Sequence, residues 1–153
     1  MLLEERVWQL SEEYAIEKYK DAYRFETSSG IKYEVDYKMV RIYKSVKIKD
    51  LELEEGDRII SIEFFRRLGR ERQYGITGTG DVAQVMKTAV KAISMLLSDL
   101  NPKAFMFSVK EKSREKLYDT ILKYKKMLLS GYSYMGKQRI VGVGEGYYFK
   151  KDN

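Results

Sequence analysis

The chain has 153 residues, 44% hydrophobic and 34% charged, which is enough for one domain with a buried core. It contains no cysteine and no histidine, which excludes disulfides, thiolate zinc sites, thiol nucleophiles and histidine-based triads. The net charge of +6 is uneven, because residues 1–76 hold 15 basic and 16 acidic side chains whereas residues 77–153 hold 14 and 7. Such a basic excess suits a polyanionic ligand or an acidic partner.

The sequence shows no proline-, glycine- or serine-rich linker, so we expect a single domain over residues 1–153. No apolar run approaches the roughly 20 residues that a membrane-spanning helix needs, and acidic side chains interrupt the first ten residues too early for a signal peptide. The sequence therefore predicts a cytoplasmic protein with no membrane partner. No carboxylate spacing argues for a metal site.

The first half of the chain predicts one helix followed by strands. Residues 4–20 carry apolar side chains at roughly helical spacing among charges, which predicts a helix. Residues 22–40 predict a β-hairpin, because two aromatic-rich runs flank a Ser-Ser-Gly turn and the second run alternates with charges. Residues 41–57 are polar and mixed, and indicate a continuing strand followed by a loop. Residues 57–68 have the β-branched and aromatic composition of a core strand.

The second half predicts alternating strands and helices. Residues 73–80 predict a strand that ends in a glycine-rich turn, and the helix that follows, at 81–97, has apolar side chains at i, i+3, i+4 and i+7. Residues 101–109 predict a short strand, residues 111–129 an amphipathic helix, and residues 133–151 one or two strands.

This order of elements predicts an α+β fold in which a mixed β-sheet is flanked by helices. The strands before and after the 81–97 helix should lie side by side and parallel. Antiparallel hairpins should precede and follow this central unit.

The turn GITGTG, at residues 75–80, leads directly into the central helix. Gly78 and Gly80 would let the backbone approach a phosphate, and Thr79 could add a hydroxyl donor. The turn matches neither the P-loop nor the dinucleotide-binding pattern. Asp81 would itself cap the helix and oppose a phosphate. A phosphate cradle and a plain strand–helix corner both remain open.

Several motifs resemble one family. The stretches that carry the resemblance are FETSSGIKYEVDY, ITGTGDVAQVMKTAVKAI, AFMFSV, SREKLYDTIL and YYFKK. From Phe25 to Lys150 the chain is similar to small tailed-phage proteins built on a GNAT-type N-acetyltransferase fold. In catalytic GNAT proteins the glycine turn grips the pyrophosphate of acyl-CoA, and two parallel strands splay apart to admit the pantetheine arm. The Arg or Gln that opens this grip corresponds here to Gly75, so one phosphate ligand is missing.

The resemblance also implies roles for particular residues. If the chain is catalytic, acetyl-CoA is its cofactor, and the cofactor-binding residues are Gly78, Thr79 and Gly80. Tyr118 would act as the general acid toward the leaving thiolate, and Glu63, on the preceding strand, is a candidate base for the acceptor amine.

Three functions follow from these features. The first expectation is a non-catalytic protein that binds a host or viral macromolecule, with a protein partner ahead of nucleic acid, in the cytoplasm of an infected cell. An acyl-CoA-dependent N-acetyltransferase is the alternative. A further alternative is nucleic-acid binding without sequence specificity, through the basic connection that carries Arg66, Arg67, Arg70 and Arg72.

Overall fold

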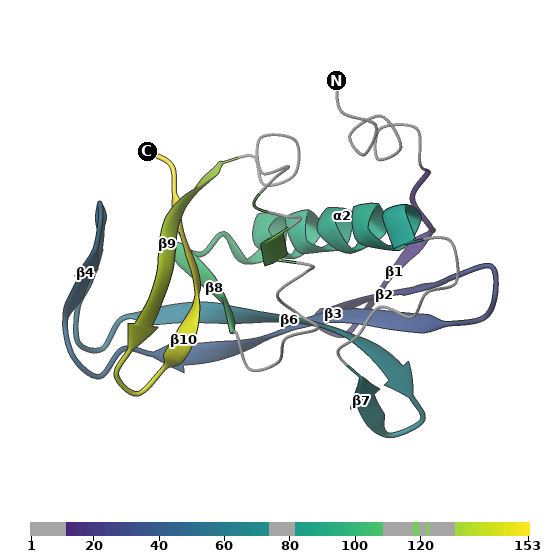
Figure 1. The fold of residues 1–153 in the computed structure, drawn as a ribbon, viewed down its shortest axis with the longest axis horizontal. Helices are drawn as coiled ribbons and strands as arrows, with labels where there is room; N and C mark the ends of the chain where they lie inside the picture. The colour runs from purple at the N-terminus through teal and green to yellow at the C-terminus, as the bar shows by residue number, and fades with distance from the viewer. Residues whose placement is uncertain (1–11, 74–81, 109–117, 120–121, 123–130) are drawn as a thin grey trace.

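The computed structural model of the chain describes residues 12–73, 82–108, 118–119, 122 and 131–153. Within them lies one long helix, α2 (Val82–Leu100), and Tyr118, Asp119 and Leu122 are also helical (Figure 1). The strands are β1 (Ile16–Tyr19), β2 (Ala22–Glu26), β3 (Lys32–Arg41), β4 (Val46–Ile48), β5 (Leu51–Leu53), β6 (Arg58–Leu68), β7 (Glu71–Gln73), β8 (Ala104–Ser108), β9 (Tyr132–Ile140) and β10 (Gly144–Lys151).

Eight of the strands form one twisted sheet. Its order is β1-β2-β3-β6-β8-β10-β9, and β7 pairs with β6. Every pairing in this sheet is antiparallel except that of β6 with β8. An α+β fold with a mixed sheet is therefore confirmed, as are the hairpin at 22–40 and the strands at 57–68 and 101–109.

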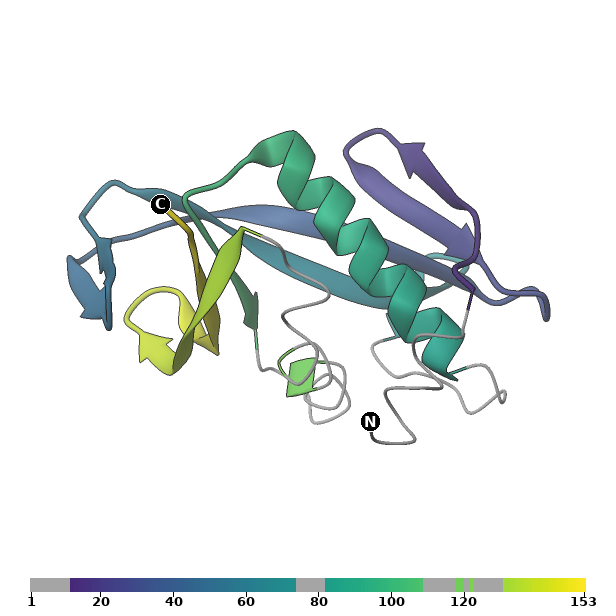
Figure 2. The same cartoon turned by 90° about the horizontal axis from the view of Figure 1, so that it is seen from above.

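Helix α2 lies across one face of the sheet (Figures 1 and 2). It confirms the helix predicted from Asp81 onward, and its apolar stripe buries Val85, Ala89, Ile93 and Leu96. The helix ends where Asn101 takes a positive φ of 47° and donates its backbone N–H to the Leu97 carbonyl at 2.8 Å. A left-handed residue of this kind commonly closes a helix.

Aromatic rings fill the core between α2 and the sheet. The Tyr33 ring stacks on Phe25 and on Phe64, with both pairs of ring centroids 5.3 Å apart. Phe25 and Tyr33 are direct cross-strand partners, so the β2–β3 register brings them together. Such aromatic pairs add about 0.5–1.5 kcal/mol each beyond the burial of their area. This core therefore holds β2, β3 and β6 under the helix.

The other face of the sheet is covered in part by a separate two-stranded sheet of β4 and β5. Ile48, Leu51 and Leu53 from this hairpin pack with Met106 and Tyr148 in a second core. Strand β3 does continue into the 41–57 segment, as far as Arg41, but the loop expected after it was wrong, because β4 and β5 lie there. The alternation of Leu51 and Leu53 around one exposed residue gives the short strand its single buried face.

The predicted helix at 4–20 was also wrong where the structure describes it. Residues 16–19 form β1, which pairs antiparallel with β2 through a two-residue turn in which Lys20 has a φ of 55°. With two apolar residues, Ile16 and Tyr19, this four-residue segment is too short for its spacing to separate a helix from a strand. Pairing with β2 decides between them, because it satisfies the backbone groups of β1.

Two further expectations lie partly outside the described residues. Of the strand predicted at 73–80, only Gln73 is described, and it ends β7, which runs antiparallel to β6. The described parallel pair consists of β6 and β8, and the parallel pairing expected for the 73–80 strand stays a prediction. Of the helix predicted at 111–129, the three described residues are helical.

Strands β9 and β10 form a hairpin, so the region predicted to hold one or two strands holds two. Its register shifts between Tyr148 and Phe149, which leaves Met135 of β9 as an extra residue. This bulge lets Met135 join the second core, where it is 8% exposed.

Candidate functional site

The candidate site lies where two parallel strands separate. Strands β6 and β8 pair only over Ile60–Ile62 and Phe105–Phe107. Strand β6 then continues to Leu68, and its last three residues pair with β7 on the edge that β8 has left. In open α/β sheets, ligands bind at the carboxyl ends of strands where neighbouring strands part. Gly78, Thr79 and Gly80, the predicted phosphate grip, lie outside the described residues and stay a prediction.

Tyr118 lies beside the end of β8, on the α2 side of the sheet. Its ring stacks on Phe107 with centroids 4.6 Å apart, and it meets the edge of Tyr147 at 5.7 Å. Only 1% of Tyr118 is exposed, and it belongs to the core that contains α2. Tyr118 therefore packs as a core ring, and its assignment as a proton donor stays a prediction.

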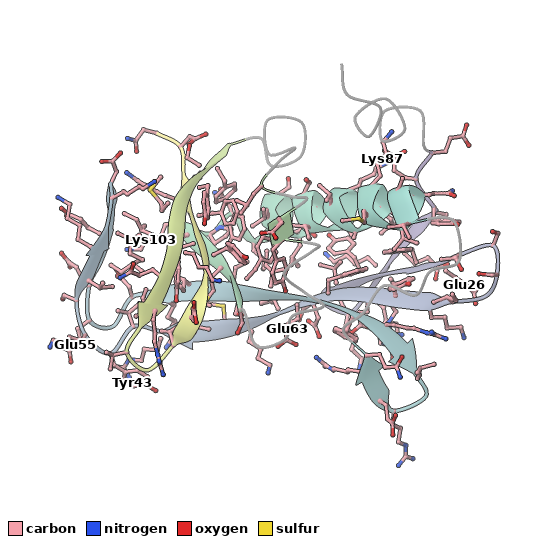
Figure 3. The ribbon with its side chains drawn as sticks, viewed as in Figure 1. Glu26, Tyr43, Glu55, Glu63, Lys87 and Lys103 are labelled. Carbon is pink, nitrogen blue, oxygen red and sulfur yellow. The ribbon has the colours of Figure 1, made fainter. Side chains whose placement is uncertain are left out.

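Glu63 lies on the opposite face of the sheet, as Figure 3 shows. Its neighbours in sequence, Ile62 and Phe64, both belong to the α2 core, so alternation along β6 turns Glu63 away from it. Its carboxylate accepts a hydrogen bond from Arg72 at 2.9 Å and forms an ion pair with Lys38 at 3.4 Å. The structure thus does not bring Glu63 and Tyr118 together.

The four arginines predicted to bind nucleic acid do not form one patch. Arg67 and Arg72 are direct cross-strand partners on the face away from α2. Arg67 contacts Glu34 at 3.4 Å, and Arg72 contacts Glu63 and stacks over a phenylalanine ring. Arg66 alternates to the α2 side, where its Nε is buried and has no hydrogen-bond partner among the described residues. Arg70 is exposed on the β6–β7 turn.

A network of ion pairs on the face away from α2 was not anticipated. The Glu34 carboxylate, on β3, accepts a hydrogen bond from the Arg24 Nε atom at 2.5 Å and pairs with Arg67 as well. Asp36, two residues further along β3, lies 3.9 Å from Arg72. Charged residues that alternate with apolar ones normally indicate a solvated face, and nothing in the sequence reveals that Glu34 is only 5% exposed.

A groove of about 750 Å³ crosses the same face near the β6–β7 turn. Arg24, Lys32 and Arg67 line it together with Glu17 and Glu26. Three cations and two carboxylates line it, and both arginines already pair with Glu34. The electrostatic potential of the groove is therefore neither strongly positive nor strongly negative, and would not select a charged ligand.

A separate ion pair joins the end of α2 to the β1–β2 hairpin. The Asp99 carboxylate accepts hydrogen bonds from the Tyr23 hydroxyl and from Lys18, the latter at 3.0 Å. The hydrogen bond from Tyr23, followed by that from Lys18, lowers the pKa of the Asp99 carboxyl. Burial, followed by the hydrogen bond to Asp99, raises the pKa of Tyr23. This contact therefore joins the last turn of α2 to the β1–β2 hairpin.

Within the described ranges, no group of three or more acidic, histidine or cysteine residues could hold a metal ion. In the same ranges, no helix is long and apolar enough to cross a membrane. Comparisons with protein-family models, with curated proteins and with solved structures find nothing that matches this chain.

Proposed function

We propose that this chain is a GNAT-like protein that binds a macromolecule and does not transfer acetyl groups. The observation that carries the proposal is the separation of Glu63 and Tyr118 on opposite faces of one sheet. A base and an acid that serve one transfer must both come within hydrogen-bond reach of the reacting atoms. The intervening sheet prevents this for these two side chains.

The contacts of each residue add support. The Glu63 carboxylate is held by two cations, Arg72 and Lys38, which compete with any amine for its oxygen atoms. The Tyr118 ring is enclosed by Phe107 and Tyr147. Both residues have a structural role that explains why they are present without invoking catalysis.

The GNAT-like part of the proposal is supported by the strand arrangement. The resemblance implies two parallel strands that splay apart, and β6 and β8 pair over three residues before β7 replaces β8 at the edge of β6. The resemblance to tailed-phage proteins implies a host or viral macromolecule as the partner, in an infected cell. Fold and chemistry are separable, since a fold persists after its catalytic groups are lost.

The direct test is the release of free CoA from acetyl-CoA. The chain has no cysteine, so a thiol reagent reports CoA without a protein background. We expect the rate with spermidine or a lysine-containing peptide to equal the rate without protein. Amine-dependent turnover above that rate would overturn the proposal, and its loss in Glu63→Gln and in Tyr118→Phe would assign the transfer to these two residues.

Binding of acetyl-CoA without turnover is the second candidate, favoured by the separation of β6 and β8. At 100 times its Kd a ligand raises the unfolding free energy by ~2.7 kcal/mol, which is visible as a higher Tm. Thermal unfolding with and without about 1 mM acetyl-CoA, repeated for Gly78→Asp, tests it. A Tm increase that disappears in the variant supports a phosphate grip at the predicted turn. An unchanged Tm rejects this candidate.

A further inference from the structure

The second half of β3 forms an open edge of the main sheet. Strand β2 pairs with β3 only over Tyr23–Glu26 and Lys32–Val35, whereas β6 pairs with β3 as far as Arg41. In Figure 2, β3 therefore continues past the end of the purple β1–β2 hairpin. Among the described strands, none pairs with residues 36–41 on the side away from β6. A strand edge of this kind can accept a further strand.

The hydrogen bonds at the end of β3 show which backbone groups point to this edge. Ile42 donates its N–H to the Asp57 carbonyl at 2.8 Å, and the Ile42 carbonyl accepts a hydrogen bond from the Gly56 N–H at 2.8 Å. Ile42 thus turns both of its backbone groups toward the β6 side, and this direction alternates from residue to residue along an antiparallel strand. Met39 and Arg41 therefore turn their N–H and carbonyl groups toward the open edge.

The side chains along this edge leave it free for pairing. Met39, at its centre, is 57% exposed, although its cross-strand partner on β6 is buried in the α2 core. The Tyr37 N–H donates to the carboxylate of its own neighbour, Asp36, at 2.7 Å. Lysines often protect an edge strand from association, but Lys38 turns to the other face and pairs with Glu63 at 3.4 Å.

We infer that two copies of this chain form a dimer in which residues 37–41 of β3 pair antiparallel across a two-fold axis at Met39. Met39 of one copy then lies opposite Met39 of the other, and Tyr37 lies opposite Arg41 on the same face of the joined sheet. Pairing satisfies the outward backbone groups and covers the two exposed thioethers. The Arg41 guanidinium gains the Tyr37 ring of the other copy as a cation–π partner.

The side chains of the strand favour this register over its neighbours. A shift by one residue would place side chains of opposite faces together. A shift by two residues in one direction places Lys38 opposite Lys38, and like charges directly opposite each other destabilise a sheet. A shift by two in the other direction shortens the pairing, because β3 ends at Arg41. The register centred on Met39 therefore fits a second copy best.

A pairing of this length belongs with the small, transient interfaces, which bury less than about 1,200 Å². The dimer should therefore form only at high protein concentration. This inference rests on the edge of the sheet alone and is independent of the proposed function.

The first test uses an introduced thiol, because the chain has no cysteine of its own. Directly opposed residues that exchange backbone hydrogen bonds have Cα atoms about 5.5 Å apart, which a disulfide can span. We therefore expect Met39→Cys to form a covalent dimer with oxidised glutathione, measured on a non-reducing gel. Met95→Cys is the matched control, since Met95 is 36% exposed but lies on α2.

The second test is sedimentation equilibrium from about 5 to about 500 µM protein, a range that detects a weak dimer. We expect the unmodified chain and Met95→Lys to dimerise alike. Met39→Lys should raise the Kd of the dimer at least about tenfold, because it places two lysines opposite each other at the axis. Thermal unfolding of each variant confirms that it folds.

The inference is overturned if the unmodified chain sediments as a monomer throughout this range, which leaves the edge to a strand from another protein. It is also overturned if Met39→Lys dimerises as the unmodified chain does, or if Met95→Cys cross-links as fast as Met39→Cys. None of these results bears on CoA release, so failure here and failure of the proposed function are distinct.

Discussion

Replacing Glu34 by Gln should destabilise the fold more than any surface charge change. The substitution keeps the shape of the side chain but removes the charge that Arg24 and Arg67 share, at 2.5 and 3.4 Å. The Glu34 side chain is only 7% exposed, whereas its two partners are 30% and 34% exposed. Breaking a fully buried pair costs about 3–5 kcal/mol. Because both arginines can regain water, we expect a loss of about 2 kcal/mol.

The assay for Glu34→Gln is urea unfolding followed by far-ultraviolet circular dichroism. The midpoint should fall with an unchanged m value, and Tm should fall by roughly 4–8 °C for a chain of this size. Glu52→Gln is the matched control, since its pair with Lys47 spans 3.7 Å between side chains that are about 70% exposed. We expect the control to change the unfolding free energy by less than about 0.5 kcal/mol.

The two variants together test the reasoning. Equal midpoints for Glu34→Gln and Glu52→Gln would refute it, because the attraction in the Glu34 network would then only balance the cost of removing its charges from water. A large loss for both would point instead to a general effect of reducing negative charge on a basic protein.

Three further predictions concern other parts of the sheet. Gly146→Ala should cost about 1–3 kcal/mol of unfolding free energy in urea, because a Cβ atom there would lie 2.5 Å from the Phe107 carbonyl oxygen. Glu63→Gln should cost about 1 kcal/mol in the same assay, less than Glu34→Gln, because its partners are more exposed. Burial raises the pKa of Tyr148, so its share of stability is complete below the unfolded pKa of about 10 and is lost as pH rises above it. Tm measured from pH 8 to 11 should therefore decline less in Tyr148→Phe than in the unmodified chain.

Strong periodicity made part of the fold predictable from sequence. The apolar stripe of α2 follows one period for 19 residues, and no strand could bury it on one face. The 22–40 hairpin was equally clear, because its turn residues and the alternation of its apolar and charged residues both predict two paired strands. In both cases local pattern and tertiary packing favour the same structure.

Short segments were predicted less well, because their tertiary partners decide their structure. Ile16–Tyr19 has only four residues, too few to separate a helical period from alternation, and the open edge of β2 selects the strand. The hairpin of β4 and β5 has three residues in each strand. Its burial depends on a second core that forms from β8, β9 and β10, far away in sequence.

The candidate site was predictable only in part, because the residue types in a sequence do not show which side chains pair with each other. Residue type suggested Glu63 and the arginines of the β6–β7 connection, but residue type says nothing about which ion pairs a folded chain makes. Glu34 carried no signal at all, since a glutamate in an alternating strand normally faces water.

Strand alternation decides which side chains of β6 and β8 lie on the same face of the sheet as Tyr118. A base acting with Tyr118 would have to lie on the α2 face, and there the central strands offer Ile60, Ile62 and Phe64 from β6 and Phe105 and Phe107 from β8. None of these side chains can accept a proton, and shifting β6 by one residue to bring Glu63 inward would expose its whole apolar set. The positions of β6 that face α2 therefore hold apolar side chains that stabilise the core, and none of the three is a carboxylate that could act as a base.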